Sequence, residues 1–267
     1  MRILILGGTR EARELAGDAT GEHGLEIVSS LAGRVRAPVL PSGEVRVGGF
    51  GGVAGLRNWL SDNGVEAVVD ATHPFAATIS AHAAEATAAL GVPLLYLRRP
   101  GYAEQPGDRW IRVPDLAVAA ETVATLGERV FLTIGRQGVA AFAHLAEQWF
   151  LIRAIDPPTG ALPPQHEIML ARGPFDPDAE RSLLAARRID VVVTKDSGGA
   201  DTSAKLDAAR ERGIPVLMID RPPLPDGATV VPTVAAAMEW LRAQARSGTD
   251  RPSNVGNRSN HSSTARS

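Results

Sequence analysis

The chain has 267 residues, which is long enough for two modest domains, and 44% of the residues are hydrophobic and 22% charged, as in ordinary globular proteins. Its formal net charge of -2 at pH 7 provides no overall field to attract nucleic acid or an anionic membrane, so an anionic ligand must meet a local cluster of positive charge. The absence of cysteine excludes disulfides, thiolate metal sites and cysteine nucleophiles.

Short apolar runs alternate with Ala-rich stretches along the first half of the chain, a pattern typical of β-α-β units in a parallel sheet. Strands are expected at Ile3–Leu6, Glu26–Ser30, Val45–Val47, Ala67–Ala71 and Leu94–Leu97, and helices at Arg10–Ala16 and Phe75–Leu90. The second half shows the same alternation. Its strands are expected at Val130–Ile134, Phe150–Ile155, Ile168–Ala171, Val191–Thr194 and Val216–Ile219, and its helices at Leu116–Leu126, Pro177–Ala186, Ser203–Arg212 and Val234–Ala245.

A repeated segment relates the two halves. The run Gly91–Leu95, followed by Arg99-Pro100, recurs as Gly213–Leu217, followed by Arg221-Pro222. All α/β units share patterns of this kind, but the agreement favours a duplicated architecture. We therefore expect an α/β protein with two Rossmann-like parallel-sheet domains, at residues 1–105 and 106–246, and an active site in the cleft between them.

Residues 247–267 form a polar tail whose only aliphatic side chains are Val255 and Ala265. The tail cannot bury enough apolar surface to order itself, so we expect it to be disordered, with a nucleic-acid-binding arm as the alternative. No apolar run reaches the roughly 18 residues that span a bilayer, and no basic leader precedes the first strand, so a cytoplasmic protein is expected.

A glycine turn follows the first predicted strand and opens the first helix. Gly7, Gly8, Thr9 and Arg10 place backbone N–H groups, a hydroxyl and a guanidinium at the positive end of a helix dipole, where an anion binds well. The full G-x-G-x-x-G fingerprint of dinucleotide sites is absent, and a tight βα turn without a ligand is the alternative explanation.

The end of the second predicted strand favours one cofactor. NAD-preferring proteins place an acidic side chain there to bind the ribose hydroxyls, whereas this chain has Ser30, followed by Arg34. No carboxylate would repel a 2′-phosphate, so the pattern favours NADPH over NADH. A solvated loop arginine is the alternative for Arg34.

Two further loops follow strands of the first half. The glycine-rich loop around Gly49 and Phe50 would let backbone approach the nicotinamide half of a cofactor. The next loop contains Thr72 and His73, and both are predicted to bind the cofactor. The histidine would donate to a phosphate or ribose, with capping of the following helix as the alternative.

The chain's only two lysines flank one loop of the second half, Thr194 to Ser203. This loop gathers glycines, hydroxyls and ammonium groups that would hold the carboxylates of an acidic substrate over the cofactor, with Gln137 on a neighbouring turn. A capped βα loop without a ligand is the alternative. The predicted substrate-binding residues are Arg136, Lys195, Ser197, Gly198, Gly199 and Lys205.

The sequence lacks the motifs of several other catalytic and metal-binding sites. The sequence has no P-loop, no Tyr-x-x-x-Lys pair, no G-x-S-x-G elbow and no histidine spacing of the H-x-x-x-H type, so we expect no metal.

The motifs GGTREA, SLAGR, GGFGG, DATHPFA and TKDSGG occur in this order, and together they make the chain resemble the precorrin-6A reductase family of cobalamin biosynthesis. The resemblance covers nearly all of residues 1 to 240. It implies NADPH-dependent reduction of one double bond in an anionic tetrapyrrole, giving precorrin-6B. It also implies that Gly8, Thr9, Arg10, Ser30 and Arg34 bind the cofactor and that Lys195, Ser197, Gly198 and Lys205 bind the substrate.

In such a reaction the cofactor supplies the hydride, and the protein aligns donor and acceptor and excludes water. The proton for the adjacent carbon has four candidate sources: His73, Asp196, a substrate carboxylate and water. Reduction of another substrate on the same fold and nucleotide sensing without turnover are the competing functions. The oligomeric state is not written in the sequence, and a monomer is favoured.

Overall fold

The first sheet is parallel throughout, and its inner strands are buried on both faces, as is usual for parallel strands. The computed structural model describes residues 1–33 and 40–249. Its first sheet has the strand order β12-β5-β4-β1-β2-β3. The strands are β1 (Arg2–Leu6), β2 (Glu26–Leu31), β3 (Glu44–Val47), β4 (Ala67–Asp70), β5 (Leu94–Leu97) and β12 (Thr229–Val231).

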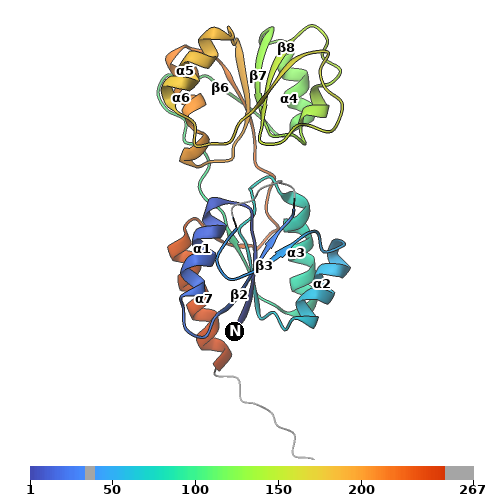
Figure 1. Cartoon of the computed structure of the whole chain (residues 1–267), viewed down its shortest axis with the longest axis vertical. Helices are drawn as coiled ribbons and strands as arrows, with labels where there is room; N and C mark the ends of the chain where they lie inside the picture. The colour runs from blue at the N-terminus through green and yellow to red at the C-terminus, as the bar shows by residue number, and fades with distance from the viewer. Residues whose placement is uncertain (34–39, 250–267) are drawn as a thin grey trace, which may run out of the picture.

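Apolar residues on both faces of this sheet explain its helical layers. Ile3 and Ile5 of β1 pack with α1 and α7, whereas Leu4 and Leu6 pack with α2 and α3. Figure 1 shows the same two layers in the lower lobe. The helices are α1 (Arg10–Thr20), α2 (Gly52–Asp62), α3 (Ala77–Leu90) and α7 (Val234–Thr249).

The second sheet repeats this plan with the order β6-β11-β10-β7-β8-β9, also parallel throughout. The strands are β6 (Trp110–Val113), β7 (Arg129–Thr133), β8 (Trp149–Ala154), β9 (Gln165–Leu170), β10 (Val191–Lys195) and β11 (Val216–Ile219). Its helices are α4 (Leu116–Val123), α5 (Pro177–Ala186) and α6 (Ala204–Glu211), with 3₁₀ turns at Val139–Phe142 and Ala200–Thr202. The predicted fold class is confirmed.

The two domains exchange their sixth strands. After β5 the chain leaves the first sheet and forms β6 at the edge of the second, and after β11 it returns to place β12 beside β5. The expectation that residues 106–246 all belong to the second half is therefore wrong for β12 and α7, which pack on the first sheet. Consecutive elements usually neighbour each other, and nothing local in the sequence marks the return.

The repeated Arg-Pro pairs lie in the two segments that cross between the domains. Arg99-Pro100 lies in the first crossing, after β5, and Arg221-Pro222 lies in the second crossing, after β11. Arg221 donates from Nε to the carbonyl of Asp196 (2.6 Å), and from its two Nη groups to the carbonyls of Arg99 (2.7 Å) and Pro100 (2.9 Å). Arg99 in turn donates to the carbonyl of Ser197 (2.8 Å) and to Glu11 of α1 (2.8 Å). Each crossing is thus bonded to the other and to both domains.

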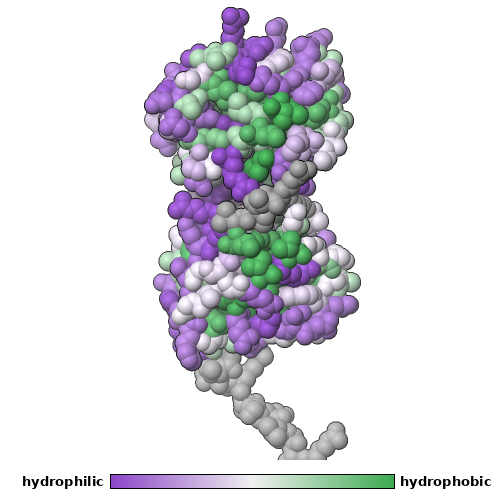
Figure 2. Space-filling model, viewed as in Figure 1, coloured by the Kyte–Doolittle hydropathy of each residue, from purple (hydrophilic) through white to green (hydrophobic). Residues whose placement is uncertain are grey.

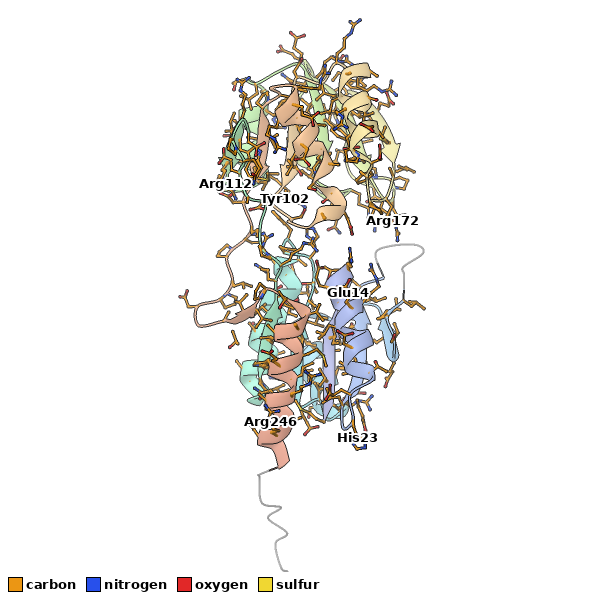
Figure 3. The ribbon with its side chains drawn as sticks, turned by 90° about the vertical axis from the view of Figure 1, so that its left-hand side faces the viewer. Glu14, His23, Tyr102, Arg112, Arg172 and Arg246 are labelled. Carbon is orange, nitrogen blue, oxygen red and sulfur yellow. The ribbon has the colours of Figure 1, made fainter. Side chains whose placement is uncertain are left out.

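Tyr102 and Arg112 add side-chain contacts at the junction, where Figure 3 shows them close to the connecting segments. The Asp196 carboxylate accepts from the Tyr102 N–H (2.8 Å) and from the Arg112 guanidinium (2.8 Å). In the face shown in Figure 2, apolar side chains gather on both lobes near this junction, among hydrophilic ones.

Three elements were not expected from the sequence, and a fourth is longer than expected. The short strands β6 and β12 were not expected because few of their residues are fully buried, and α2 was not expected because two glycines interrupt its pattern. Helix α7 continues to Thr249, three residues into the predicted tail. The remainder of that tail, residues 250–267, lies outside the described residues.

Gly198 is where the second-domain loop approaches the first crossing, and replacing it tests this contact. Gly198 has φ +63°, and a Cβ there would lie 2.1 Å from the Pro100 carbonyl oxygen. Gly213 has φ +64° but open space around it, so Gly213→Ala is a matched control for backbone strain alone. We expect Gly213→Ala to lower the unfolding free energy by about 1 kcal/mol and Gly198→Ala by about 1–3 kcal/mol more.

The measurement is urea denaturation of the wild type and both variants, monitored by far-UV circular dichroism. Equal losses in the two variants would show that the close approach at Pro100 contributes nothing to stability.

Candidate functional site

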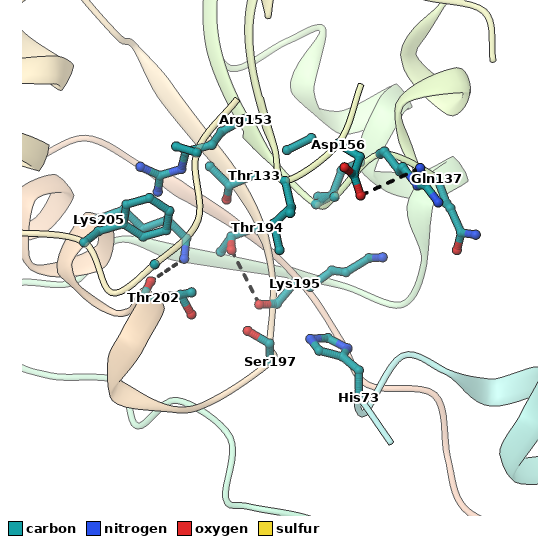
Figure 4. A pocket seen from close by; sticks show the side chains of 18 residues that line it. His73, Thr133, Gln137, Arg153, Asp156, Thr194, Lys195, Ser197, Thr202 and Lys205 are labelled. Atoms are coloured by element: carbon teal, nitrogen blue, oxygen red, sulfur yellow. Dashed lines mark hydrogen bonds and ion pairs between the residues drawn. The ribbon is translucent and has the colours of Figure 1, made fainter. Parts of the chain in front are cut away.

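A cavity of about 420 Å³ lies at the carboxyl ends of β7, β8 and β10, within the usual size range of small-molecule sites. The loops that follow these strands supply most of its wall. His73 reaches it from the first domain, as Figure 4 shows below Ser197 and Lys195. The cavity is therefore completed across the domain junction.

Four cationic side chains line this cavity: Arg136, Arg153, Lys195 and Lys205. Asp156 also lines it and lies 4.0 Å from Arg136. Arg153 is held by a buried bidentate pair with Glu180, at 2.5 and 2.9 Å, and by the Phe175 ring 3.7 Å from its guanidinium carbon. The charge of the cavity wall is positive, and it suits an anionic ligand.

Lys205 is 3% exposed, and its Nζ donates to the Thr202 carbonyl at 2.5 Å. Burial, as the largest cause, and the nearby Arg153 together lower the pKa of its ammonium group to about 7, while Glu180 opposes the shift. Because Glu180 is already engaged by Arg153, an anion in the cavity would stabilise the charged form of Lys205.

Lys195 is half-buried, and burial lowers the pKa of its ammonium group. Its Nζ lies 5.1 Å from the centre of the Phe75 ring, which belongs to the first domain. This cation–π geometry is a direct side-chain contact between the predicted substrate loop and the loop that carries His73.

His73 accepts a hydrogen bond at Nδ1 from the Phe75 N–H (3.2 Å), an arrangement that puts the proton of the neutral ring on Nε2. His73 is exposed at the edge of the cavity, but the atoms around its ring partly desolvate it, and Arg99, Lys195 and Arg221 repel a second proton, while Glu11 opposes the shift. These effects lower the pKa of His73 to about 4. The residue is neutral at pH 7 and donates only through Nε2–H.

The predicted substrate residues separate into two groups. Arg136, Lys195, Ser197 and Lys205 line the cavity, whereas Gly198 and Gly199 pack against the first crossing.

Asp196, a candidate proton donor, lies outside the cavity wall, and both its carboxylate oxygens already accept hydrogen bonds. The structure therefore favours a structural role for Asp196.

Tyr102 was not found from the sequence. Its hydroxyl lies 3.2 Å from Ser197 Oγ and 2.7 Å from Thr202 Oγ1, so it bridges two ends of the substrate loop. Tyr102 belongs to the segment that connects the domains, far from the loop in sequence, and no local pattern links the two.

The glycine turn leaves space beside its backbone. Gly8 has φ +119° with open space around it, and the first N–H groups of α1 have no partner within the helix. The Thr9 hydroxyl, predicted to contact phosphate, instead caps α1 by accepting from the Ala12 N–H (3.1 Å) and donates to the Ala71 carbonyl (2.8 Å). Arg10 pairs with Glu14 and, across the junction, lies 3.7 Å from Asp201.

Ser30 lies beside the turn, since its carbonyl accepts from the Gly7 N–H at 2.9 Å. Arg34 lies outside the described residues. A different arginine, Arg46 of β3, donates to Ser30 Oγ (3.2 Å) and to the carbonyls of Gly48 and Gly49 (both 2.7 Å). Its guanidinium carbon lies 3.7 Å from the centre of the Phe50 ring. Sequence reasoning did not single out Arg46.

Thr72 is held by buried Asp70, whose Oδ1 accepts from the Thr72 N–H (3.0 Å) and hydroxyl (2.6 Å). The other Asp70 oxygen accepts from Ser80 (2.5 Å). This network sets the backbone just before His73 and ties up the Thr72 hydroxyl that was predicted to contact cofactor.

No cluster of three or more metal-ligating side chains occurs among residues 1–33 and 40–249. Within the same ranges, no helix has the length and apolarity to cross a membrane.

The model of the family described as precorrin-6x reductase CbiJ/CobK matches residues 2–242. The chain belongs to this family. The resemblance predicted from the ordered motifs is thus confirmed. A member from Rhodococcus erythropolis, named precorrin-6A reductase, is 58% identical over 240 residues, which cover 90% of this chain and 97% of the relative.

Another family member, the precorrin-6A reductase of Mycobacterium tuberculosis (strain H37Rv), is 54% identical over 242 residues, covering 90% of this chain and 97% of the relative. A solved structure described as CobK precorrin-6A reductase superposes with a TM-score of 0.83 at 46% identity. The superposition covers 91% of this chain and 97% of the solved one. The two-domain fold is therefore that of the family.

For this family member we expect the His73 ring to stay neutral from pH 8 down to about pH 5 and to titrate near pH 4. An unfolded histidine titrates near pH 6.5, so below that pH the unfolded chain gains the proton first, and folding stability falls as the pH drops from about 6.5 to 4. Lys195→Met removes one repelling cation and is expected to raise the His73 pKa.

Ring nitrogen NMR shifts of His73 against pH measure this directly, and Arg212→Met, which removes an exposed cation elsewhere in the second domain, is the control. A wild-type midpoint near 6.5 would contradict the proposed environment.

Proposed function

We propose that this protein reduces precorrin-6A to precorrin-6B in cobalamin biosynthesis, with NADPH as the hydride donor. The observation that carries the proposal is the cationic cavity at the end of the second sheet, completed by His73 of the domain that holds the glycine turn. The names of the relatives from Rhodococcus erythropolis and Mycobacterium tuberculosis point to the same substrate.

The first domain fits a dinucleotide. The strand order places β1 at the centre of the sheet, between β2 and β4, as in dinucleotide-binding folds. The open Gly8 position lets backbone N–H groups approach a phosphate, and the last three residues of β2 are Ser29, Ser30 and Leu31, none of which is a carboxylate. These features support a nicotinamide cofactor whose adenosine carries a 2′-phosphate.

The second domain fits the substrate. Precorrin-6A, as a tetrapyrrole with acetate and propionate groups, presents several carboxylates at its rim. Arg136, Lys195 and Lys205 lie where they would pair with such groups, and desolvation strengthens each pair formed in the cavity.

When bound, NADPH supplies a hydride from its nicotinamide ring. The protein's own residues hold the macrocycle against that ring and limit access of water. His73, neutral at pH 7, keeps its Nε2–H as a hydrogen-bond donor at the boundary between the two ligands. Among the cavity side chains, burial lowers the ammonium pKa of Lys195 and that of Lys205, and the Lys205 pKa of about 7 suits proton donation near neutral pH.

The direct test incubates the purified protein with precorrin-6A and NADPH. We expect the nicotinamide absorbance to fall only when both are present, and the product to gain two hydrogens by mass spectrometry. NADPH binding without substrate-dependent consumption would instead favour the sensor function, and consumption with another substrate alone would favour a different reductase.

Lys195→Ala tests the assignment of the cavity to the substrate. Loss of one charge-assisted contact is expected to raise the substrate KM by about 10- to 100-fold. The dissociation constant for NADPH, measured by fluorescence titration, should change less than about twofold. Arg212→Ala, a charge loss outside the cavity, should change neither quantity. A selective loss of NADPH affinity in Lys195→Ala would move this loop to the cofactor site.

A further inference from the structure

Arg46 occupies the carboxyl end of β3 next to the end of β2. The parallel register pairs Leu6 with Ser30 and Ser30 with Arg46, so the three residues form one row across the edge of the sheet where the glycine turn begins. We propose that Arg46 binds the 2′-phosphate of NADPH and thereby selects NADPH over NADH. This inference rests on the nicotinamide cofactor of the proposed function.

The position follows from the geometry of dinucleotide sites. The phosphates lie at the turn after the first strand, and the adenosine ribose lies at the end of the second strand, where a side chain contacts its 2′ position. Here that place is held by Ser30, and the Arg46 guanidinium reaches Ser30 Oγ at 3.2 Å. The guanidinium of Arg46, which comes from β3, thus lies next to the position expected for a 2′-phosphate.

Charge supports the same assignment. No carboxylate within residues 1–33 and 40–249 forms an ion pair with Arg46, although the side chain is half-buried. Burial lowers the pKa of Arg46, whereas Arg10, which bonds to Glu14, has a raised pKa. A half-buried cation without an acidic neighbour is poorly compensated, and an anionic ligand would supply the missing charge.

The guanidinium is also oriented in advance. Its Nη1 group donates to Ser30 Oγ and the Gly48 carbonyl, and its Nη2 group donates to the Gly49 carbonyl. The Phe50 ring covers one face at 3.7 Å. Of the five N–H donors of an arginine, the Nε–H and one Nη2–H have no acceptor in the described part of the chain, and a pair of such donors suits phosphate oxygens.

The competing explanation is that Arg46 only braces the glycine loop 48–52 through these carbonyl bonds. A brace supports the binding of both cofactors equally, because NADPH and NADH differ only at the 2′-phosphate. A phosphate ligand affects NADPH alone. The ratio of the two affinities therefore separates the explanations without any measurement of activity.

The experiment measures dissociation constants of NADPH and NADH by fluorescence titration for the full-length wild type, Arg46→Gln, Arg46→Lys and the control Arg57→Gln. Arg57 is an exposed cation on α2, outside the proposed site. We expect Arg46→Gln to weaken NADPH by about 10- to 100-fold and NADH by less than about twofold. Arg46→Lys keeps the positive charge but loses the paired N–H donors of the guanidinium, so we expect an intermediate loss of NADPH affinity. Arg57→Gln should match the wild type.

Equal weakening of both cofactors by Arg46→Gln would show a brace and overturn the inference. It would also be overturned if Arg46→Gln kept the wild-type preference while Arg34→Gln abolished it. If Arg46→Gln fails to fold, as judged by circular dichroism, the ratio of the NADPH and NADH dissociation constants of Arg46→Lys decides between a phosphate ligand and a brace. A wild type that binds neither nucleotide would reject the proposed function itself, and a wild type that binds both equally would reject only the selective role of Arg46.

Discussion

The arrangement of the two domains depends on the hydrogen bonds of Arg221 at the crossings. This one guanidinium donates to carbonyls of Asp196, Arg99 and Pro100, and so joins the second crossing, the first crossing and the loop that follows β10. Gly198 lets these backbones approach so closely that a Cβ would overlap the Pro100 oxygen. The loop with Lys195 and Ser197 is consequently fixed relative to the first domain, and the cavity that spans the junction takes its shape from this contact.

Exchange of the sixth strands makes each domain contribute to the other's sheet. β6, the next strand in the chain after β5, forms an edge of the second sheet. β12, near the end of the described chain, forms an edge of the first sheet. Two chain segments therefore connect the domains in opposite directions, and Arg99 and Arg221 bond them to each other. Two bonded connections restrict relative rotation more than one linker does. Loops from both sheets can then form one site with the accurate geometry that a reductase needs to position its substrate.

Ten of the strands were predictable from short runs rich in apolar residues. Eight of them are largely buried, as a parallel sheet imposes on its inner strands, whereas the edge strands β3 and β9 have no fully buried residue. The place of β12 was not predictable, since Thr229–Val231 is short, largely exposed, and paired with a strand far away in the sequence. The cations of the cavity were partly predictable, because Lys195 and Lys205 follow one strand. Arg153 lies within β8, and Arg46 acts through a side chain that reaches a neighbouring strand, so neither follows from a loop motif.

The electrostatics of the cavity indicate a site built for a ligand rather than for the stability of the free protein. Lys195 and Lys205 carry lowered ammonium pKa values, and His73 loses its charge above about pH 4. Each shift has burial as its largest cause, so the protein has placed these groups where their charged forms are poorly solvated. An anion in the cavity would oppose the shifts of both lysines, because it favours the protonated ammonium. Since His73 comes from the first domain and both lysines from the second, an anion that accepts from the neutral His73 ring and pairs with the lysines would also link the two domains at the site.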